Sequence, residues 1–181
     1  GTGESAVFSS PAAGALRDVV VDHIVQGFVV FPGAGYLEMV RAACLDTPML
    51  QRRVFFMQPL ILSNPTQSMR VFCELLPLER FEIGSEGAAE ETSRTSHCSG
   101  ALQLLENAGT LQRPYVEAAS KTCSFAADVV DFYQGFRKYG LDYGKEFQRL
   151  AKVHVSTSFD ETAGRLHRRS RRQGTLVHPA D

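Results

Sequence analysis

Several features that mark large protein classes are missing from this chain of 181 residues. No apolar run reaches the roughly 18 residues of a membrane-spanning helix, so we expect no membrane insertion. Residues 1–10 lack a basic stretch followed by an apolar core, so we expect no signal peptide. The 19 lysines and arginines nearly balance 20 aspartates and glutamates, and a net charge of −1 argues against a nucleic-acid partner. The chain also lacks an initiator methionine, from which we expect an excised or processed domain.

Cysteine is scarce as well. The four residues, Cys44, Cys73, Cys98 and Cys123, form no CxxC pair, so the usual spacing of a zinc or redox site is absent. We interpret them as reduced, mostly buried thiols of a cytoplasmic protein, and we expect no metal. The remaining composition, with 44% hydrophobic and 22% charged residues, is that of a globular chain. The length fits one domain or slightly more.

Hydrophobic periodicity predicts a strand-rich N-terminal region with one helix. Residues 1–14 are rich in small residues and are interpreted as a leader or linker. Two strand-like runs, 19–25 and 28–31, flank a bend. From residue 34 the apolar spacing becomes that of a helix, which we expect to end before Pro48. Further strand-like runs follow at 54–62, 69–76 and 93–106.

The C-terminal half contains the same kinds of element after a connector at residues 109–121. Residues 126–139 carry a broad apolar face and predict a helix that ends at Gly140. Strands are expected at 147–157 and 164–167. The order of strand, helix and several strands favours an α+β fold in which an antiparallel sheet wraps around a helix.

Two segments carry charge of mainly one sign. Residues 79–91 hold five glutamates and one arginine, and we interpret them as a solvated hairpin tip or insertion. Residues 165–172 hold five arginines. They are either a solvated turn between strands or a docking surface for an acidic partner.

His23 is the strongest candidate for chemistry among the five histidines. Such a histidine among apolar residues is either a packed core residue or a general base, because a buried neutral imidazole can accept a proton near neutral pH. Gly27 would permit the close approach of a substrate. Pro32 and Gly33 would place the N–H groups of a helix start beside an oxygen that gains charge. Periodicity alone leaves both interpretations open.

The sequence of this region resembles a motif of a known family. Residues 22–39 read DHIVQGFVVFPGAGYLEM and resemble the HxxxGxxxxPGAGYLEM signature of polyketide synthase dehydratase domains. Residues 139–148, YGLDYGKEFQ, are similar to the YGPxF region of that family, with Lys145 in place of the usual proline. A weaker similarity lies in TSHCSG at residues 95–100. The resemblance spans about residues 16–181.

The resemblance implies a double hotdog fold, in which each antiparallel sheet wraps around a long central helix. A short echo between residues 30–34 and 177–181, in each of which a proline precedes an expected helix start, fits two such lobes. The implied division is a leader or linker at 1–15, an N-terminal hotdog at 16–120, a connector with a helix at 121–145, and the start of an incomplete second hotdog at 146–181.

The resemblance also implies an enzyme that eliminates water from a β-hydroxyacyl thioester on the phosphopantetheine arm of an acyl carrier protein. His23 matches the histidine that removes the α-proton, and no redox cofactor or metal is required. The other domains of the same synthase are expected partners, and a second copy of the chain is a further candidate. The residues expected to bind the substrate or shape its path are Gly27, Pro32, Gly33, Tyr143 and Gly144.

In the family an aspartate in a motif of the form HPxxxDxxxQ acts as the acid. His178 and Pro179 match the opening of this motif, but the aspartate position falls beyond residue 181. Asp181 comes two positions too early, about 200° away around a helix, and is not assigned the role. We interpret three other histidines as structural or surface residues, namely His97, His154 and His167.

Two alternatives to a dehydratase stay open. A related product-template domain shares the double hotdog and the His/Asp pair but directs aldol cyclisation. A non-catalytic, dehydratase-like module would serve as a scaffold or a carrier-protein dock, and the missing aspartate keeps this alternative in consideration. The PGAGYLEM motif at residues 32–39 favours the dehydratase.

Overall fold

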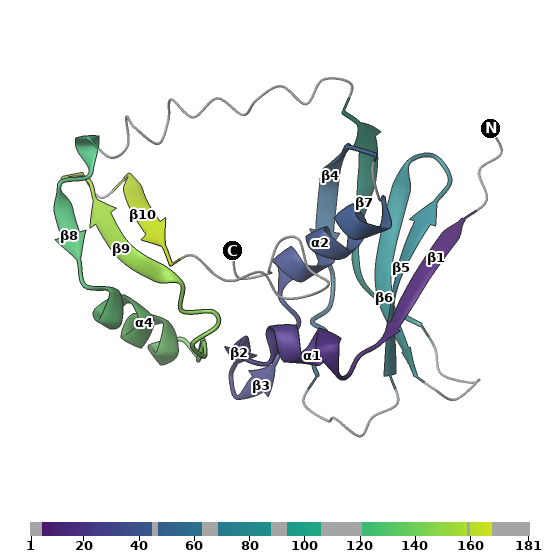
Figure 1. Cartoon of the computed structure of the whole chain (residues 1–181), viewed down its shortest axis with the longest axis horizontal. Helices are drawn as coiled ribbons and strands as arrows, with labels where there is room; N and C mark the ends of the chain where they lie inside the picture. The colour runs from purple at the N-terminus through teal and green to yellow at the C-terminus, as the bar shows by residue number, and fades with distance from the viewer. Residues whose placement is uncertain are drawn as a thin grey trace.

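The computed structural model describes residues 5–44, 47–62, 69–87, 94–105, 121–158 and 160–167. They form an N-terminal lobe with a five-stranded sheet, a C-terminal lobe with a three-stranded sheet, and a small hairpin near the place where the lobes approach each other (Figure 1). Every paired strand is antiparallel to its neighbour. Across these residue ranges, no helix is long and apolar enough to cross a membrane.

The N-terminal lobe is built on a sheet with the strand order β1-β5-β6-β7-β4. The helix α2 (Gly33–Ala43) precedes β4 in the chain and packs against β4 and β5. This arrangement, one helix against an antiparallel sheet, is the α+β architecture that the periodicity predicts. The strands are β1 (Ala6–Pro11), β4 (Met49–Phe56), β5 (Met69–Leu76), β6 (Arg80–Gly87) and β7 (Thr95–Leu104).

The core of this lobe lies between α2 and one face of the sheet. Side chains alternate across β5, so that Val71 and Cys73 enter the core while Phe72 lies on the opposite face. On α2, Tyr36 and Val40 share one face because four residues make about one helical turn. Val40 and Val71 are 0% exposed, and full burial of such a side chain contributes about 1.5–3 kcal/mol. Burial of this apolar face holds the helix on the sheet.

The start of α2 is defined by a proline and by a tight aromatic contact. Pro32 is the N-cap residue and has extended backbone angles, so the helix begins directly after it. A Cβ atom on Gly35 would lie 2.6 Å from the Phe31 ring, which explains why this position has no side chain. The Phe31 ring also lies 4.9 Å from the Tyr36 ring. These contacts hold the chain that enters α2 against the first turn of the helix.

The C-terminal lobe contains the strand order β10-β9-β8 and one helix. The helix α4 (Val129–Lys138) begins after Asp128, whose carboxylate accepts a 2.7 Å hydrogen bond from the Val130 N–H. It ends before Gly140, which has φ of 81°, an angle that glycine adopts without strain. The strands are β8 (Phe125–Ala127), β9 (Leu150–Val155) and β10 (Thr162–Leu166).

The two lobes meet at the small hairpin. The Gln26 N–H donates to the Gly140 carbonyl (2.6 Å), and the Gly144 N–H donates to the Asp22 carbonyl (2.8 Å). These backbone hydrogen bonds join the bend of the hairpin, at Gln26, and Asp22, just before the hairpin, to the loop that follows α4. The hairpin consists of β2 (Ile24–Val25) and β3 (Phe28–Val29).

Two expectations for the N-terminal segment are wrong. Residues 1–15 are not merely a leader or linker, because residues 6–11 form β1 and pair with β5 along their whole length. Residues 19 and 20 end a helix, α1 (Ala15–Val20), instead of starting a strand. Val20 is 0% exposed, and its burial in the core outweighs the preference of valine for strands.

The interpretation of residues 79–91 as a solvated tip is also wrong. Residues 80–87 form β6, the central strand of the five-stranded sheet, and only residues 77–79 form the turn. Strand alternation explains the composition: Phe81 is 1% exposed in the core, whereas Glu86 lies on the outer face. Glu82 and Glu86 therefore belong to one face of a buried strand.

The other predicted elements are confirmed where the structure describes them. α2 and α4 overlap the predicted helical segments, and β5, β7, β9 and β10 overlap the predicted strands, but residues 126 and 127, expected at the start of a helix, belong to β8. The strand expected at 54–62 overlaps only the end of β4. The described cysteines have free thiols, and burial raises the pKa of Cys73 to about 12 and of Cys98 to about 11. Most of the connector and of the arginine-rich segment, with His178 and Asp181, lies outside the described residues.

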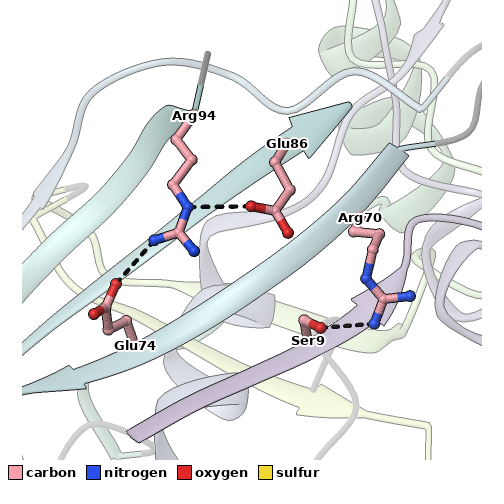
Figure 2. A network of polar contacts seen from close by, with 5 residues as sticks. All are labelled: Ser9, Arg70, Glu74, Glu86 and Arg94. Atoms are coloured by element: carbon pink, nitrogen blue, oxygen red, sulfur yellow. Dashed lines mark hydrogen bonds and ion pairs between the residues drawn. The ribbon is translucent and has the colours of Figure 1, made fainter. Parts of the chain in front are cut away.

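The outer face of the large sheet carries a network of polar side chains (Figure 2). The Arg94 guanidinium lies 4.5 Å from the centre of the Phe72 ring and pairs with Glu74 (3.3 Å) and Glu86 (3.1 Å). A Cβ atom on Gly84 would overlap the same ring, so the missing side chain makes room for it. Phe72 is consequently 1% exposed although it points away from the core.

Candidate active site

His23 lies where the chain leaves α1 and enters the hairpin. Its ring is half-buried, and its Nδ1 atom lies 2.7 Å from the Val30 carbonyl oxygen. Its own carbonyl accepts a 3.1 Å hydrogen bond from the Val30 N–H. Because a carbonyl oxygen can only accept, Nδ1 carries the hydrogen, and in the neutral ring Nε2 carries the lone pair. A histidine in this tautomer can accept a proton at Nε2.

Two aromatic rings from the C-terminal part of the chain lie beside His23. The Tyr143 ring is stacked at 5.1 Å with 25° between the planes, and the Phe147 ring lies at 5.1 Å with 54°. Burial lowers the pKa of His23 from its ordinary value of 6.5, and the hydrogen bond to Val30 opposes this effect only in part. The imidazole is therefore neutral at neutral pH.

Gly144 lies directly against Asp22, the residue before His23. Its N–H donates to the Asp22 carbonyl, and a Cβ atom at this position would overlap the Asp22 carboxyl group. The same carboxylate accepts a 2.9 Å hydrogen bond from the Glu146 N–H. The loop is thus clamped onto the residue next to the candidate base, and the clamp holds the two aromatic rings beside the imidazole.

Pro32 and Gly33 also lie close to this arrangement in the fold. They start α2 two residues after Val30, whose carbonyl orients the His23 ring. Pro32 is buried, and a Cβ atom on Gly33 would lie 3.2 Å from the Phe56 ring. No side-chain hydrogen bond caps α2, and of its first N–H groups that of Gly35 donates to the Pro32 carbonyl (2.9 Å).

Gly27 lies at the bend between β2 and β3, and its backbone angles call for glycine. Its φ is 81°, and no atom lies within 4 Å of where a Cβ would be. The position therefore needs glycine for the bend between β2 and β3, where Gln26 also has a positive φ of 51°. Close approach by another part of the chain does not explain it.

The structure adds contacts that the sequence reasoning missed. The Val30 carbonyl carries no side-chain signal, and Phe147 was identified only as part of a motif. Asp22 was quoted in the first motif, but its pairing with a loop 124 positions away, at Glu146, depends on the fold. Of the other histidines, His97 is buried, whereas His154 is half-buried on β9. Among the described residues, no three His, Cys, Asp or Glu side chains are grouped closely enough to hold a metal ion.

Comparison with known sequences gives one consistent family. Two sequence-family models match the chain. The one described as polyketide synthase dehydratase domain matches residues 1–85, and the one described as polyketide synthase dehydratase N-terminal domain matches residues 112–180. Polyketide synthase PksM of Bacillus subtilis (strain 168) is 30% identical in an alignment of 151 residues that covers 74% of this chain. Highly reducing polyketide synthase frbB of Dothideomycetidae sp. (strain 11243) is 29% identical in an alignment of 165 residues that covers 75% of this chain. The chain spans 3% and 6% of the lengths of these relatives.

Solved structures show the same fold. The dehydratase domain from the CurK module of the curacin polyketide synthase has a TM-score of 0.81 and 21% identity, over 98% of this chain and 66% of that chain. The dehydratase domain of a mycocerosic acid synthase-like polyketide synthase has a TM-score of 0.74 and 22% identity, over 98% of this chain and 64% of that chain. They confirm the expected hotdog fold. With this fold, both family models and the related synthases in agreement, the chain belongs to the polyketide synthase dehydratase domain family.

Proposed function

We propose that this chain removes water from a β-hydroxyacyl thioester carried on the phosphopantetheine arm of an acyl carrier protein, with His23 as the general base. The hydrogen bond from His23 to the Val30 carbonyl carries the proposal, because it leaves Nε2 as the basic nitrogen. Burial keeps this ring neutral at neutral pH. The dehydratase family of the chain supports the same reaction.

The elimination moves a proton, an electron pair and a hydroxyl group. Nε2 of His23 takes the α-proton, and the electron pair of that C–H bond forms the C=C bond while the β-carbon loses its hydroxyl. Negative charge builds up on the thioester oxygen during this step. The N–H groups at the start of α2, beside Pro32 and Gly33, offer the positive end of a helix dipole to that charge.

The leaving hydroxyl needs a proton of its own, because hydroxide is a poor leaving group. We propose an aspartate beyond residue 181 as its donor, so that water is the second product. Each well-placed proton transfer contributes about 10²–10⁴-fold to the rate. Atoms and charges balance without a redox cofactor or a metal ion.

The acyl chain in this proposal lies along apolar surface near His23. Tyr143 and Phe147 border the imidazole on one side. Phe28 and Phe56 are 52% and 57% exposed, and their rings offer further apolar surface near the hairpin and the start of α2. Such exposed rings suit an apolar ligand because covering them removes apolar area from water. Gly144 contributes indirectly, because its N–H donates to the carbonyl of Asp22, the residue before His23.

Three partners belong to this proposal: the acyl carrier protein, the other domains of the same synthase, and a second copy of the chain. The related synthases are far longer than this chain, which supports further domains beside it.

Lys152 and Arg165 face each other across β9 and β10, and both are exposed. Like charges opposite each other repel, so an acidic partner would stabilise this pair. The pair supports a docking surface for such a partner.

The test is mass spectrometry of a carrier-bound β-hydroxyacyl chain incubated with the synthase polypeptide that contains this chain. We expect loss of one water from the bound acyl group. His23→Ala should reduce this loss by at least about a hundredfold, because it removes one of the two proton transfers. His154→Ala is the matched control, since it removes a half-buried histidine on β9 and should leave turnover unchanged.

Retained turnover in a folded His23→Ala variant would refute the role of His23. An aromatic product from a poly-β-keto chain, without water loss from the β-hydroxyacyl substrate, would identify a product-template domain instead. No reaction of either kind, with carrier protein still bound, would identify a scaffold or docking module.

A further inference from the structure

A second histidine, His97, is held as firmly as His23. It lies on β7 and is 4% exposed. Its Nδ1 atom lies 3.0 Å from the Gln58 carbonyl oxygen, and its Nε2 atom lies 2.7 Å from the Ser85 hydroxyl. The carbonyl can only accept, so Nδ1–H donates to it, and the Ser85 hydroxyl donates to Nε2. Both ring nitrogens are satisfied, and the ring is fixed in one neutral tautomer.

His97 holds the segment after β4 in two ways. The Met57 N–H donates to the His97 carbonyl (2.9 Å), and the ring holds the carbonyl of the next residue, Gln58. From α2, the Tyr36 ring stacks parallel to the imidazole, with 2° between the planes and 6.3 Å between the centres. One buried residue thus anchors residues 57 and 58 through both its backbone and its side chain.

The anchored segment continues into the backbone ladder that supports Val30. Only Pro59 separates Gln58 from this ladder. Two backbone hydrogen bonds of 2.8 Å join residues 60 and 62 to residues 31 and 29, one on each side of Val30. Ile61 forms an isolated bridge with Val30 itself. The direction of the Val30 carbonyl, which accepts from the His23 ring, therefore depends on where residues 60–62 lie.

We propose that His97 is a positioning residue for dehydration: held by Ser85, it fixes Gln58 and, through residues 59–62, the Val30 carbonyl that selects the basic tautomer of His23. This inference rests on the proposed function, because the tautomer matters for the reaction only if His23 removes a proton. A merely structural His97 would stabilise β7 without any effect on the His23 ring. The positioning role requires that a change at His97 be detected at His23.

The test is the ¹⁵N NMR spectrum of the histidine side chains in the 181-residue chain, with His23 assigned from a His23→Gln variant. We expect His23 to have a protonated Nδ1 and an unprotonated Nε2. His97→Phe keeps a ring beside Tyr36 but removes both hydrogen bonds, and it should give His23 a mixture of the two neutral tautomers. His97→Asn keeps an amide donor for Gln58 and should restore the single tautomer. His154→Phe, the control, should change nothing at His23.

Activity provides a second readout in a synthase that dehydrates its substrate. His97→Phe should lower kcat by about tenfold to a hundredfold with little change in KM, as expected when a catalytic group is misplaced by less than about 1 Å. The NMR result does not need turnover. A synthase polypeptide that fails to dehydrate its substrate would refute the proposed function, while the effect of His97 on His23 would still be measured.

An unchanged His23 tautomer in folded His97→Phe overturns the inference. If that variant does not fold, Pro59→Gly decides, because Pro59 is exposed and lies in the link between Gln58 and the ladder. Glycine there loosens the link without touching the core. A mixed His23 tautomer in Pro59→Gly supports the positioning role, and an unchanged one refutes it.

Discussion

The Nδ1 atom of His23 and the carbonyl oxygen of Val30 lie 2.7 Å apart and are brought together by the β2–β3 hairpin. This contact decides which nitrogen of the His23 ring carries the lone pair, so the fold of the hairpin sets the tautomer of the candidate base. The same hairpin also contacts the loop after α4 through the Gln26 N–H. Changes in that loop or at the bend of the hairpin are therefore expected to alter the position of the His23 ring.

The lowered pKa of His23 predicts how the rate depends on pH. Only the neutral imidazole accepts a proton, so the acidic limb of the pH–rate profile should lie below pH 6.5, where the rate of water loss falls as the pH decreases through the lower folded-state pKa. Phe147→Asn should move the midpoint up towards 6.5, because a polar side chain reduces the desolvation of the ring. Phe132→Asn on α4 is the control. Initial rates over a pH series provide the measurement, and a midpoint above 6.5 in the unaltered protein would contradict the prediction.

Gly144→Ala is expected to destabilise the protein by about 1–3 kcal/mol, as overpacking does, because the new methyl group would overlap the Asp22 carboxyl group. Gly135→Ala is the matched control. No atom lies within 4 Å of its Cβ position on α4, and alanine is favoured over glycine there by about 1 kcal/mol. Urea unfolding of both variants measures the two free energies.

The cause of the Gly144→Ala loss can be tested with a double mutant. In Asp22→Ala the overlapping carboxyl group is absent, so adding Gly144→Ala should cost less than it does in the unaltered chain. Strictly additive free energies would show that the two residues do not interact.

The stability of the fold should also depend on pH through His23 and His97. Burial, opposed by a backbone hydrogen bond, lowers the pKa of each from 6.5. The neutral rings thus contribute stability that is fully present above the unfolded-state value near 6.5 and is lost as pH falls through the folded-state values. The free energy of unfolding in urea should decrease on acidification below that value. His97→Asn should reduce the slope, and an equally steep slope would contradict the prediction.

Arg94→Ala should expose the Phe72 ring and cost about 1 kcal/mol, since it removes a cation–π contact and two partly exposed ion pairs. Arg94→Met keeps an apolar cover over the ring and should cost less. Arg70 is the control on the same face, where its guanidinium donates to the Ser9 hydroxyl at 2.6 Å (Figure 2). Arg70→Ala should cost less than about 0.5 kcal/mol, as exposed surface changes do. If urea unfolding gave the same loss of unfolding free energy for Arg94→Ala and Arg70→Ala, the Arg94 side chain over the Phe72 ring would not contribute to stability.

Local pattern predicted the elements that depend on local physics. The apolar spacing after residue 34 predicts α2, and strand alternation predicts β5 and β7, because each pattern repeats within a few residues. It failed at β1 and β6, whose sequences are rich in small residues or glutamate. These strands exist because neighbouring strands satisfy their backbone hydrogen bonds and because one face of β6 is buried.

The sequence by itself determined the helix periods, the family motifs and the choice of His23, since all of these lie in short, continuous stretches of chain. Only the tertiary structure decided the tautomer and environment of that histidine. Its acceptor belongs to the opposite strand of a hairpin, and its neighbour Asp22 pairs with a loop 124 positions away. Burial and hydrogen-bond partners depend on residues that are distant along the chain, so the chemical state of the imidazole could be assigned only from the folded molecule.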